Sequence, residues 1–134
     1  TPSGDYPRWS PDGRWIAYSV WTQDSDPDQG AWVVPARGGS PQKVGTQPTR
    51  LVWSRNGRLL WQLRRAGDQI ELWETVPEVW RWSRRSTLDL GTPAASHLEH
   101  LPLTVSPRTG ELVMNRRTTL STLVVFDGLD PDRW

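Results

Sequence analysis

Three aspartates lie at alternate positions in one polar segment, a spacing that could serve metal binding. Asp24, Asp26 and Asp28 could point carboxylate oxygens toward one centre, as the loops that bind calcium do. Such a loop needs a bidentate glutamate at its twelfth position, where this chain has Pro35. The pattern therefore favours a solvated hairpin loop, and we predict no metal ion and no other cofactor.

A second polar cluster holds the two histidines of the chain, His97 and His100, with Glu99 between them. Their spacing does not match HExxH or HxxEH, so a polar loop is favoured over a zinc site. The chain also has no cysteine, no Gly-x-Ser-x-Gly turn, no glycine loop for phosphate and no dinucleotide-binding motif. We therefore expect no catalytic activity from this chain.

Two arginine pairs, Arg64-Arg65 and Arg116-Arg117, could bind an acidic partner. The chain has 16 Lys and Arg against 15 Asp and Glu, a net charge of +1. Because the basic side chains are offset by a similar number of acids, we predict no nucleic-acid binding. No run approaches the roughly 20 apolar residues of a membrane span, so we predict no membrane insertion.

The elements that must position these residues repeat three times. A strand-like segment, a turn and an apolar strand recur at 7–18, 51–61 and 103–114, with a serine before each turn. These serines are 44 and 52 residues apart, which is the length of one four-stranded blade of a β-propeller. We therefore predict an all-β fold in one domain, 1–134, with three repeats of antiparallel four-stranded blades near 6–45, 50–90 and 102–126.

The first copy resembles a TolB-type propeller repeat. The residues that carry the resemblance are Trp9–Gly13, Ile16–Tyr18, Ala31–Gly39 and Gln42–Val44. Such repeats also occur in propellers fused to bacterial winged-helix regulators and kinases, and in the propellers of prolyl oligopeptidase-like enzymes. The second copy departs at Arg55-Asn56, and we expect its turn to be one residue shorter. The third has Val105 where the first two have tryptophan.

Apolar residues occupy both faces of the predicted strands, which is typical of sheets that stack on one another. The strands are predicted near 6–10, 14–21, 31–35, 41–45, 50–54, 58–64, 69–76, 79–90, 102–106, 111–117 and 121–126. We expect six side chains to be largely buried between blades: Trp9, Ile16, Trp53, Leu60, Val105 and Val113. Most of the ten tryptophans are assigned to the same packing. Trp80 and Trp82 have an alternative role, as an exposed platform for sugars or a partner on the outermost strand.

The topology of a four-stranded blade brings the polar residues above to one end of the propeller. In an antiparallel blade with strands a to d, the b–c hairpins emerge at the same end as the d–a connections. We therefore predict a partner-binding surface at this end, made by Arg64, Arg65, Arg116, Arg117, His97, Glu99 and His100. The aspartates of 24–28 join them, while the tight turns at the opposite end are interpreted as structural.

The leading functional prediction is a non-catalytic protein-interaction or sensory module, since the resemblance implies partner binding across the loop face. The alternatives are an accessory propeller fragment of a prolyl oligopeptidase-like hydrolase and a glycan-binding propeller. The resemblance implies a soluble bacterial protein of the cytoplasm or the periplasm. Its partner is predicted to be another protein or the rest of a parent propeller.

The third unit is predicted to stop early, because the segment after Phe126 is interrupted by Gly128 and Pro131. Three blades are also fewer than the four to eight that close a propeller. We therefore expect the chain to be the C-terminal half of a larger propeller, or to pair with a second polypeptide, including a copy of itself.

Overall fold

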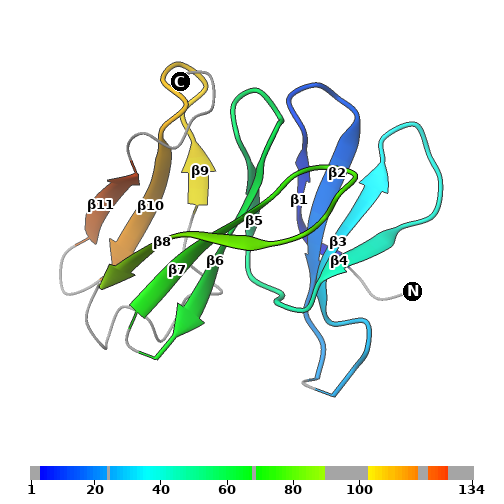
Figure 1. Ribbon diagram of the computed structural model, residues 1–134, viewed down its shortest axis with the longest axis horizontal. Helices are drawn as coiled ribbons and strands as arrows, with labels where there is room; N and C mark the ends of the chain where they lie inside the picture. Colours follow the sequence, from blue (N-terminus) through cyan, green and yellow to red (C-terminus); the bar gives the residue numbers. More distant parts are fainter. Residues whose placement is uncertain (1–3, 24, 68, 90–102, 118–120, 127–134) are drawn as a thin grey trace.

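The computed structural model describes residues 4–23, 25–67, 69–89, 103–117 and 121–126. Within these ranges the chain forms eleven β-strands and no helix, which confirms the all-β prediction (Figure 1). No helix that could span a membrane was found in them.

The strands form three antiparallel sheets, which we call blades 1, 2 and 3. Blade 1 contains β1 (Gly4–Trp9), β2 (Trp15–Val20), β3 (Gly30–Pro35) and β4 (Gln42–Gly45) in that order. Blade 2 contains β5 (Leu51–Trp53), β6 (Leu60–Ala66), β7 (Gln69–Thr75) and β8 (Ser83–Asp89). Blade 3 contains β9 (Leu103–Val105), β10 (Leu112–Arg117) and β11 (Ser121–Phe126). Each strand pairs with the next in sequence, as in propeller blades.

The predicted strands match these positions with one correction. The outer strand of blade 2 was expected from residue 79, but β8 begins at Ser83. Residues 76–82 form a connection in which Glu78 (φ 75°) and Trp80 (φ 50°) have left-handed backbones, outside the φ range of regular β-structure. Blade 3 has three strands among the described residues, while the segment after Phe126, which the predicted early stop concerns, lies outside them.

The repeated serine organises the turn between the first two strands of blades 1 and 2. In blade 1 the Ser10 hydroxyl donates to Asp12 Oδ1 (2.6 Å) and accepts from the Trp15 N–H (2.9 Å). In blade 2 the Ser54 hydroxyl makes the same bonds, to Asn56 Oδ1 (2.9 Å) and from the Leu59 N–H (3.0 Å). The two turns therefore have equal length, and the expected shortening of the second was wrong.

The same hydrogen bonds act on the charge of Asp12. Burial raises the pKa of its carboxyl, but the Ser10 hydroxyl and the Arg14 N–H donate to the carboxylate and outweigh that effect. The pKa of Asp12 is therefore lower than its ordinary value. The asparagine at the equivalent place in blade 2 accepts the same bonds without a charge.

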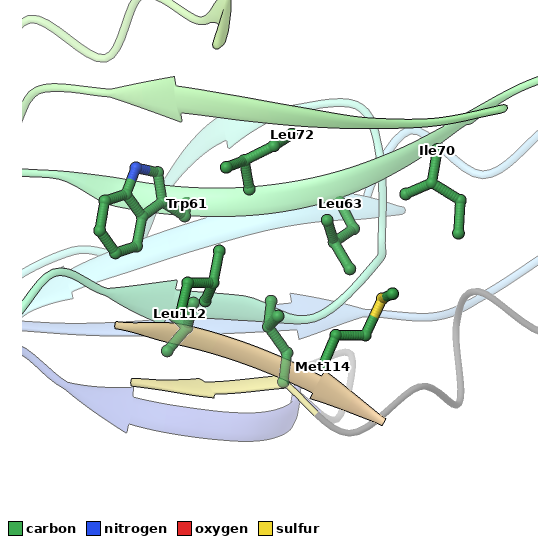
Figure 2. Close-up of a cluster of buried hydrophobic side chains, with 8 residues drawn as sticks. Trp61, Leu63, Ile70, Leu72, Leu112 and Met114 are labelled. Carbon is green, nitrogen blue, oxygen red and sulfur yellow. The ribbon is translucent and has the colours of Figure 1, made fainter. Parts of the chain in front are cut away.

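The core lies between the blades, in two clusters. The first joins blade 1 to blade 2 through Ala17, Ala31, Val33, Val44, Leu51, Trp53 and Leu60. The second joins blade 2 to blade 3 through Val52, Trp61, Leu63, Ile70, Leu72, Leu103, Leu112 and Met114. Figure 2 shows Leu112 and Met114 of β10 pointing toward side chains of β6 and β7. Blade 2 is therefore covered on both faces, which explains why its strands do not alternate between apolar and polar residues.

Buried polar side chains fix the connection between blades 1 and 2. The Gln62 side chain donates to the carbonyls of Gln47 (2.7 Å) and Thr49 (3.2 Å), and the Ser19 hydroxyl donates to that of Thr49 (2.7 Å). Buried carbonyls need such partners, because an unpaired one costs about 1–3 kcal/mol.

The six residues predicted to be buried divide according to the face they occupy. Trp53 (4% exposed) and Leu60 (0%) are buried between blades 1 and 2. Trp9 is 62% exposed, so its predicted burial was wrong, and the other three residues are only partly buried: Ile16, Val105 and Val113. Trp9, Ile16 and Val113 lie on the outward faces of blades 1 and 3, which no described sheet covers.

Candidate functional site

The two ends of the blades differ in how they are built. We call the end with the turns 10–14, 36–41, 54–59, 76–82 and 106–111 the turn end, which lies uppermost in Figure 1. The opposite end, with the β2–β3 and β6–β7 connections, is the loop end. The sequence predicted a partner surface at the loop end.

At the loop end, Arg64 does not extend into solvent. Its guanidinium lies 4.5 Å from the ring centre of Trp73 and 5.0 Å from that of Trp82. Its Nε donates to Gln62 Oε1 (3.2 Å). Burial lowers the pKa of Arg64, with nearby Glu71 opposing that shift. Arg64 therefore packs between two tryptophans, and the sequence-based expectation of an exposed pair holds only for its neighbour.

The other residues predicted to bind a partner at the loop end lie partly within and partly outside the described ranges. Arg65 is exposed, and Arg116 and Arg117 end β10 opposite Thr122 and Ser121. Three further residues lie outside the described ranges: His97, Glu99 and His100. A partner-binding role for these residues stays a prediction.

The aspartate segment forms an ordinary turn where it is described. Asp26 accepts a hydrogen bond from the Asp28 N–H (2.8 Å), while Asp24 lies outside the described residues. In the described part of the chain, no three His, Cys, Asp or Glu side chains form a group that could hold a metal ion. The bond to Asp26 is that of an Asx turn, in which the side chain stabilises its own loop.

The connection 76–82 of blade 2 crosses onto blade 1, and we call it the strap (Figure 1). Trp80 packs edge to face on Trp15, with ring centres 5.2 Å apart and planes at 89°. Trp82 Nε1 donates to the carbonyl of Val44 (2.8 Å). The two strap tryptophans thus join one blade to the next, as the assignment of most tryptophans to packing predicts, and their alternative role as an exposed platform on an outer strand is not what these contacts show.

Two hollows open at the turn end. The larger, about 470 Å³, lies beneath the strap between the first two turns, and its lining includes Arg14, Arg58, Leu59, Val76 and Pro77. Arg14 pairs with Glu78 at its edge (2.6 Å), and both side chains are mostly exposed. The lining of this hollow therefore combines apolar side chains with two arginines and two acids, Asp12 and Glu78.

The smaller hollow, about 230 Å³, lies where the first strands of the three blades meet. Its lining includes Arg8, Val52, Trp53, Arg55 and Thr104. Trp53 Nε1 donates to the carbonyl of Arg8 (2.9 Å), which joins the first strands of blades 1 and 2 along this hollow.

The turn end is strongly biased toward positive charge. Its five turns contain six arginines and three acidic residues, all of them described. The arginines are Arg14, Arg37, Arg55, Arg58, Arg81 and Arg108, and the acids are Asp12, Glu78 and Glu111. All the arginines except Arg55 are exposed. The sequence-based interpretation of these turns as structural missed this bias, which appears once each arginine is assigned to its end of the blade.

No protein-family model matches the chain, and no curated protein sequence matches it significantly. Solved structures do match. Oligogalacturonate lyase in complex with manganese aligns with a TM-score of 0.66 and 18% identity, over 93% of this chain and 34% of the lyase. TolB from Acinetobacter baumannii aligns at 0.67 and 11%, over 96% and 30% of the two chains. A putative TolB from Agrobacterium tumefaciens aligns at 0.61 and 16%, over 93% and 44%.

The chain thus spans between 30% and 44% of the length of these three proteins while almost all of it aligns. At such low identity the likeness concerns the fold and not the activity. The resemblance inferred from the first repeat is confirmed at that level: the chain has the fold of TolB-like β-propeller blades.

Proposed function

We propose that the chain is a non-catalytic interaction module that binds an acidic segment of a protein partner at its turn end. The observation that carries the proposal is the excess of six arginines over three acids on the five described turns there. Complementary charge guides a partner to the correct surface and suppresses wrong partners. The binding class is the one the sequence predicted, but the surface that we propose lies at the opposite end.

The larger hollow supports this choice of surface. Its lining holds Arg14 and Arg58 beside the acids Asp12 and Glu78, and its apolar part comes from Leu59, Val76 and Pro77. Arginine is enriched in protein interfaces, where its guanidinium can bind a carboxylate group through two hydrogen bonds. An acidic peptide could place a carboxylate on Arg58 and an apolar side chain in the hollow.

A second candidate ligand is an acidic sugar polymer. It is favoured by the structural likeness to a protein named oligogalacturonate lyase, because oligogalacturonate is itself a polyanion. The same arginines would bind its carboxylates, so the two ligands compete for one surface. The role of an accessory propeller beside a hydrolase domain has no such support and stays a prediction, to be tested by reading the parent gene.

The experiment measures the binding of two labelled probes by fluorescence anisotropy, an oligo-glutamate peptide and oligogalacturonate. The test variant carries Arg37→Glu and Arg58→Glu at the turn end, and the matched control carries Arg65→Glu at the loop end. The control is matched because Arg37, Arg58 and Arg65 are all exposed arginines. We expect the turn-end reversals to weaken peptide binding about ten-fold, with stronger binding at low salt.

The outcomes separate the alternatives. Tighter binding of oligogalacturonate than of the peptide would favour the sugar polymer, and its conversion to shorter products would overturn the non-catalytic role. If Arg65→Glu weakens binding while the turn-end variant does not, the loop end is the binding surface. Circular dichroism of each variant verifies that the fold is retained.

A further inference from the structure

The repeat places equivalent residues in different surroundings on the first two blades. Ser10 and Ser54 occupy the same turn position, so Trp9 corresponds to Trp53 and Ile16 to Leu60. Trp53 and Leu60 are buried against blade 1. Trp9 and Ile16 are paired in register on the equivalent face of blade 1, but Trp9 is 62% exposed there. We call this uncovered surface the leading face of blade 1.

More apolar side chains extend the leading face across the sheet. Tyr18 lies opposite Trp32, and Ile16 lies opposite Val34, in the β2–β3 pairing. All four are only partly buried, whereas the alternate residues Ala17 and Val33 are fully buried toward blade 2. A sheet face with three large aromatic side chains and two aliphatic ones is suited to contact with another sheet.

The other end of the stack presents the complementary surface. Blade 3 turns Leu112 and Met114 toward blade 2, so the intervening Val113 and its register partner Val125 point away. Val125 is 46% exposed. Val113 corresponds to Trp61 of blade 2, which is fully buried against blade 3. We call this outward surface the trailing face of blade 3.

We propose that these two faces bind each other in a dimer of this chain. Both observed contacts between blades join a trailing face to the next leading face. The leading face of blade 1 in one copy would bind the trailing face of blade 3 in the second copy, and the reverse. The new contacts continue the series already present within the chain.

The number of blades selects two copies. A propeller closes with four to eight blades, so two copies with the three described blades each form a ring within that range, and three copies would exceed it. A closed ring of two chains is also the commonest symmetry of soluble oligomers. Two identical contacts form at once, so neither apolar face stays in water.

A specific hydrogen bond is expected across each new contact. Within the chain, Trp53 donates from Nε1 to the carbonyl of Arg8 on the preceding blade (2.9 Å). By the repeat, Trp9 takes the place of Trp53, and Thr104 takes the place of Arg8. The Trp9 indole would therefore donate to the Thr104 carbonyl of the second copy.

The dimer is tested by sedimentation and native mass spectrometry of the full chain, with one substitution on each face. Ile16→Glu places a charge on the leading face, and Val113→Glu places one on the trailing face. Val79→Glu is the matched control, because Val79 is 65% exposed on the strap and belongs to neither face. If Ile16→Glu fails to fold, Trp9→Glu replaces it, since that side chain is already largely exposed.

We expect the wild type and Val79→Glu to have the mass of two chains. Each face variant alone should lose association by about a hundred-fold or more, because a buried unpaired charge lies in both contacts. A mixture of the two face variants should recover a two-chain species, since one of its two contacts then contains neither substitution.

Several results would overturn the dimer. A wild-type monomer at tens of micromolar, or an open-ended polymer, would rule out the closed pair. A dimer that survives Val113→Glu would mean that two leading faces bind each other. Loss of association in Val79→Glu, or no recovery in the mixture, would show that these faces do not carry the contact.

Discussion

The hydrogen bond from the strap to blade 1 leads to a quantitative prediction for Trp82→Phe. Val44 is the extra residue of an irregularity between β3 and β4, because Gly45 pairs with Ala31 and Lys43 with Trp32. An extra residue of this kind has no partner in the ladder. The carbonyl of Val44 therefore depends on the Trp82 indole for its hydrogen bond.

Phenylalanine keeps an aromatic ring in place but removes the N–H. A carbonyl left without its partner costs about 1–3 kcal/mol, and the strap can admit some water, so we expect about 1–2 kcal/mol. For a domain of this size that loss lowers the melting temperature by about 3–6 °C. With a urea dependence of about 2 kcal/mol per molar, the midpoint falls by about 0.5–1 M.

The assay is urea and thermal unfolding followed by circular dichroism. Trp21→Phe is the matched control, because Trp21 is 38% exposed at the end of β2, and it should shift stability by less than about 0.5 kcal/mol. Gly45→Ala is an independent test, since its added carbon would lie 3.0 Å from Trp82 Nε1 and push the indole away. The reasoning is refuted if Trp82→Phe changes stability no more than Trp21→Phe does.

Three further predictions follow from single contacts. Gly30→Ala should destabilise the chain by more than about 2 kcal/mol in urea unfolding. The φ of Gly30 is 146°, and the added carbon would collide with the backbone carbonyl of Gly45 on the adjacent strand. An unchanged stability would contradict this geometry of β3. The lowered pKa of Asp12 means that its contribution to stability is present at neutral pH and is lost as the pH falls through the carboxyl range. Asp12→Asn, which imitates Asn56, should keep the turn and reduce the fall in stability between about pH 7 and pH 3; an unchanged acid limb would exclude this role. Arg64→Gln should cost about 1 kcal/mol of thermal stability by removing the cation from between two tryptophans, while Arg65→Gln should cost less than about 0.5 kcal/mol; equal effects would argue against that packing.

The strands and turns could be predicted because their signals are local. A serine, an aspartate or asparagine, and a glycine at fixed spacing specify one turn through hydrogen bonds among neighbouring residues. The substitution of Asn56 for aspartate changes the charge but not these bonds, so the turn persists. The predicted shortening was wrong because the length of the turn is set by its own hydrogen bonds, and not by the positions of aromatic residues in the strand that follows it.

The strap could not be predicted, because its stability comes from contacts with another blade. Alternation of Trp80 and Trp82 resembles a strand when read in sequence. In the fold, each tryptophan has a partner on blade 1, which offsets the left-handed backbone at Glu78 and Trp80. Such long-range contacts override local propensity.

The amino-acid pattern alone was sufficient to establish the fold class and to place most of the strands, since both depend on short-range hydrogen bonding and on the repeat. It also showed that both strand faces are apolar. Whether a given face is covered depends on the sheet that lies beside it: the same repeat position is buried as Trp53 and exposed as Trp9. The tertiary structure likewise decided that Arg64 packs between Trp73 and Trp82, the second of which is held by its hydrogen bond to blade 1. Those properties arise from how neighbouring blades stack, and no local segment contains that information.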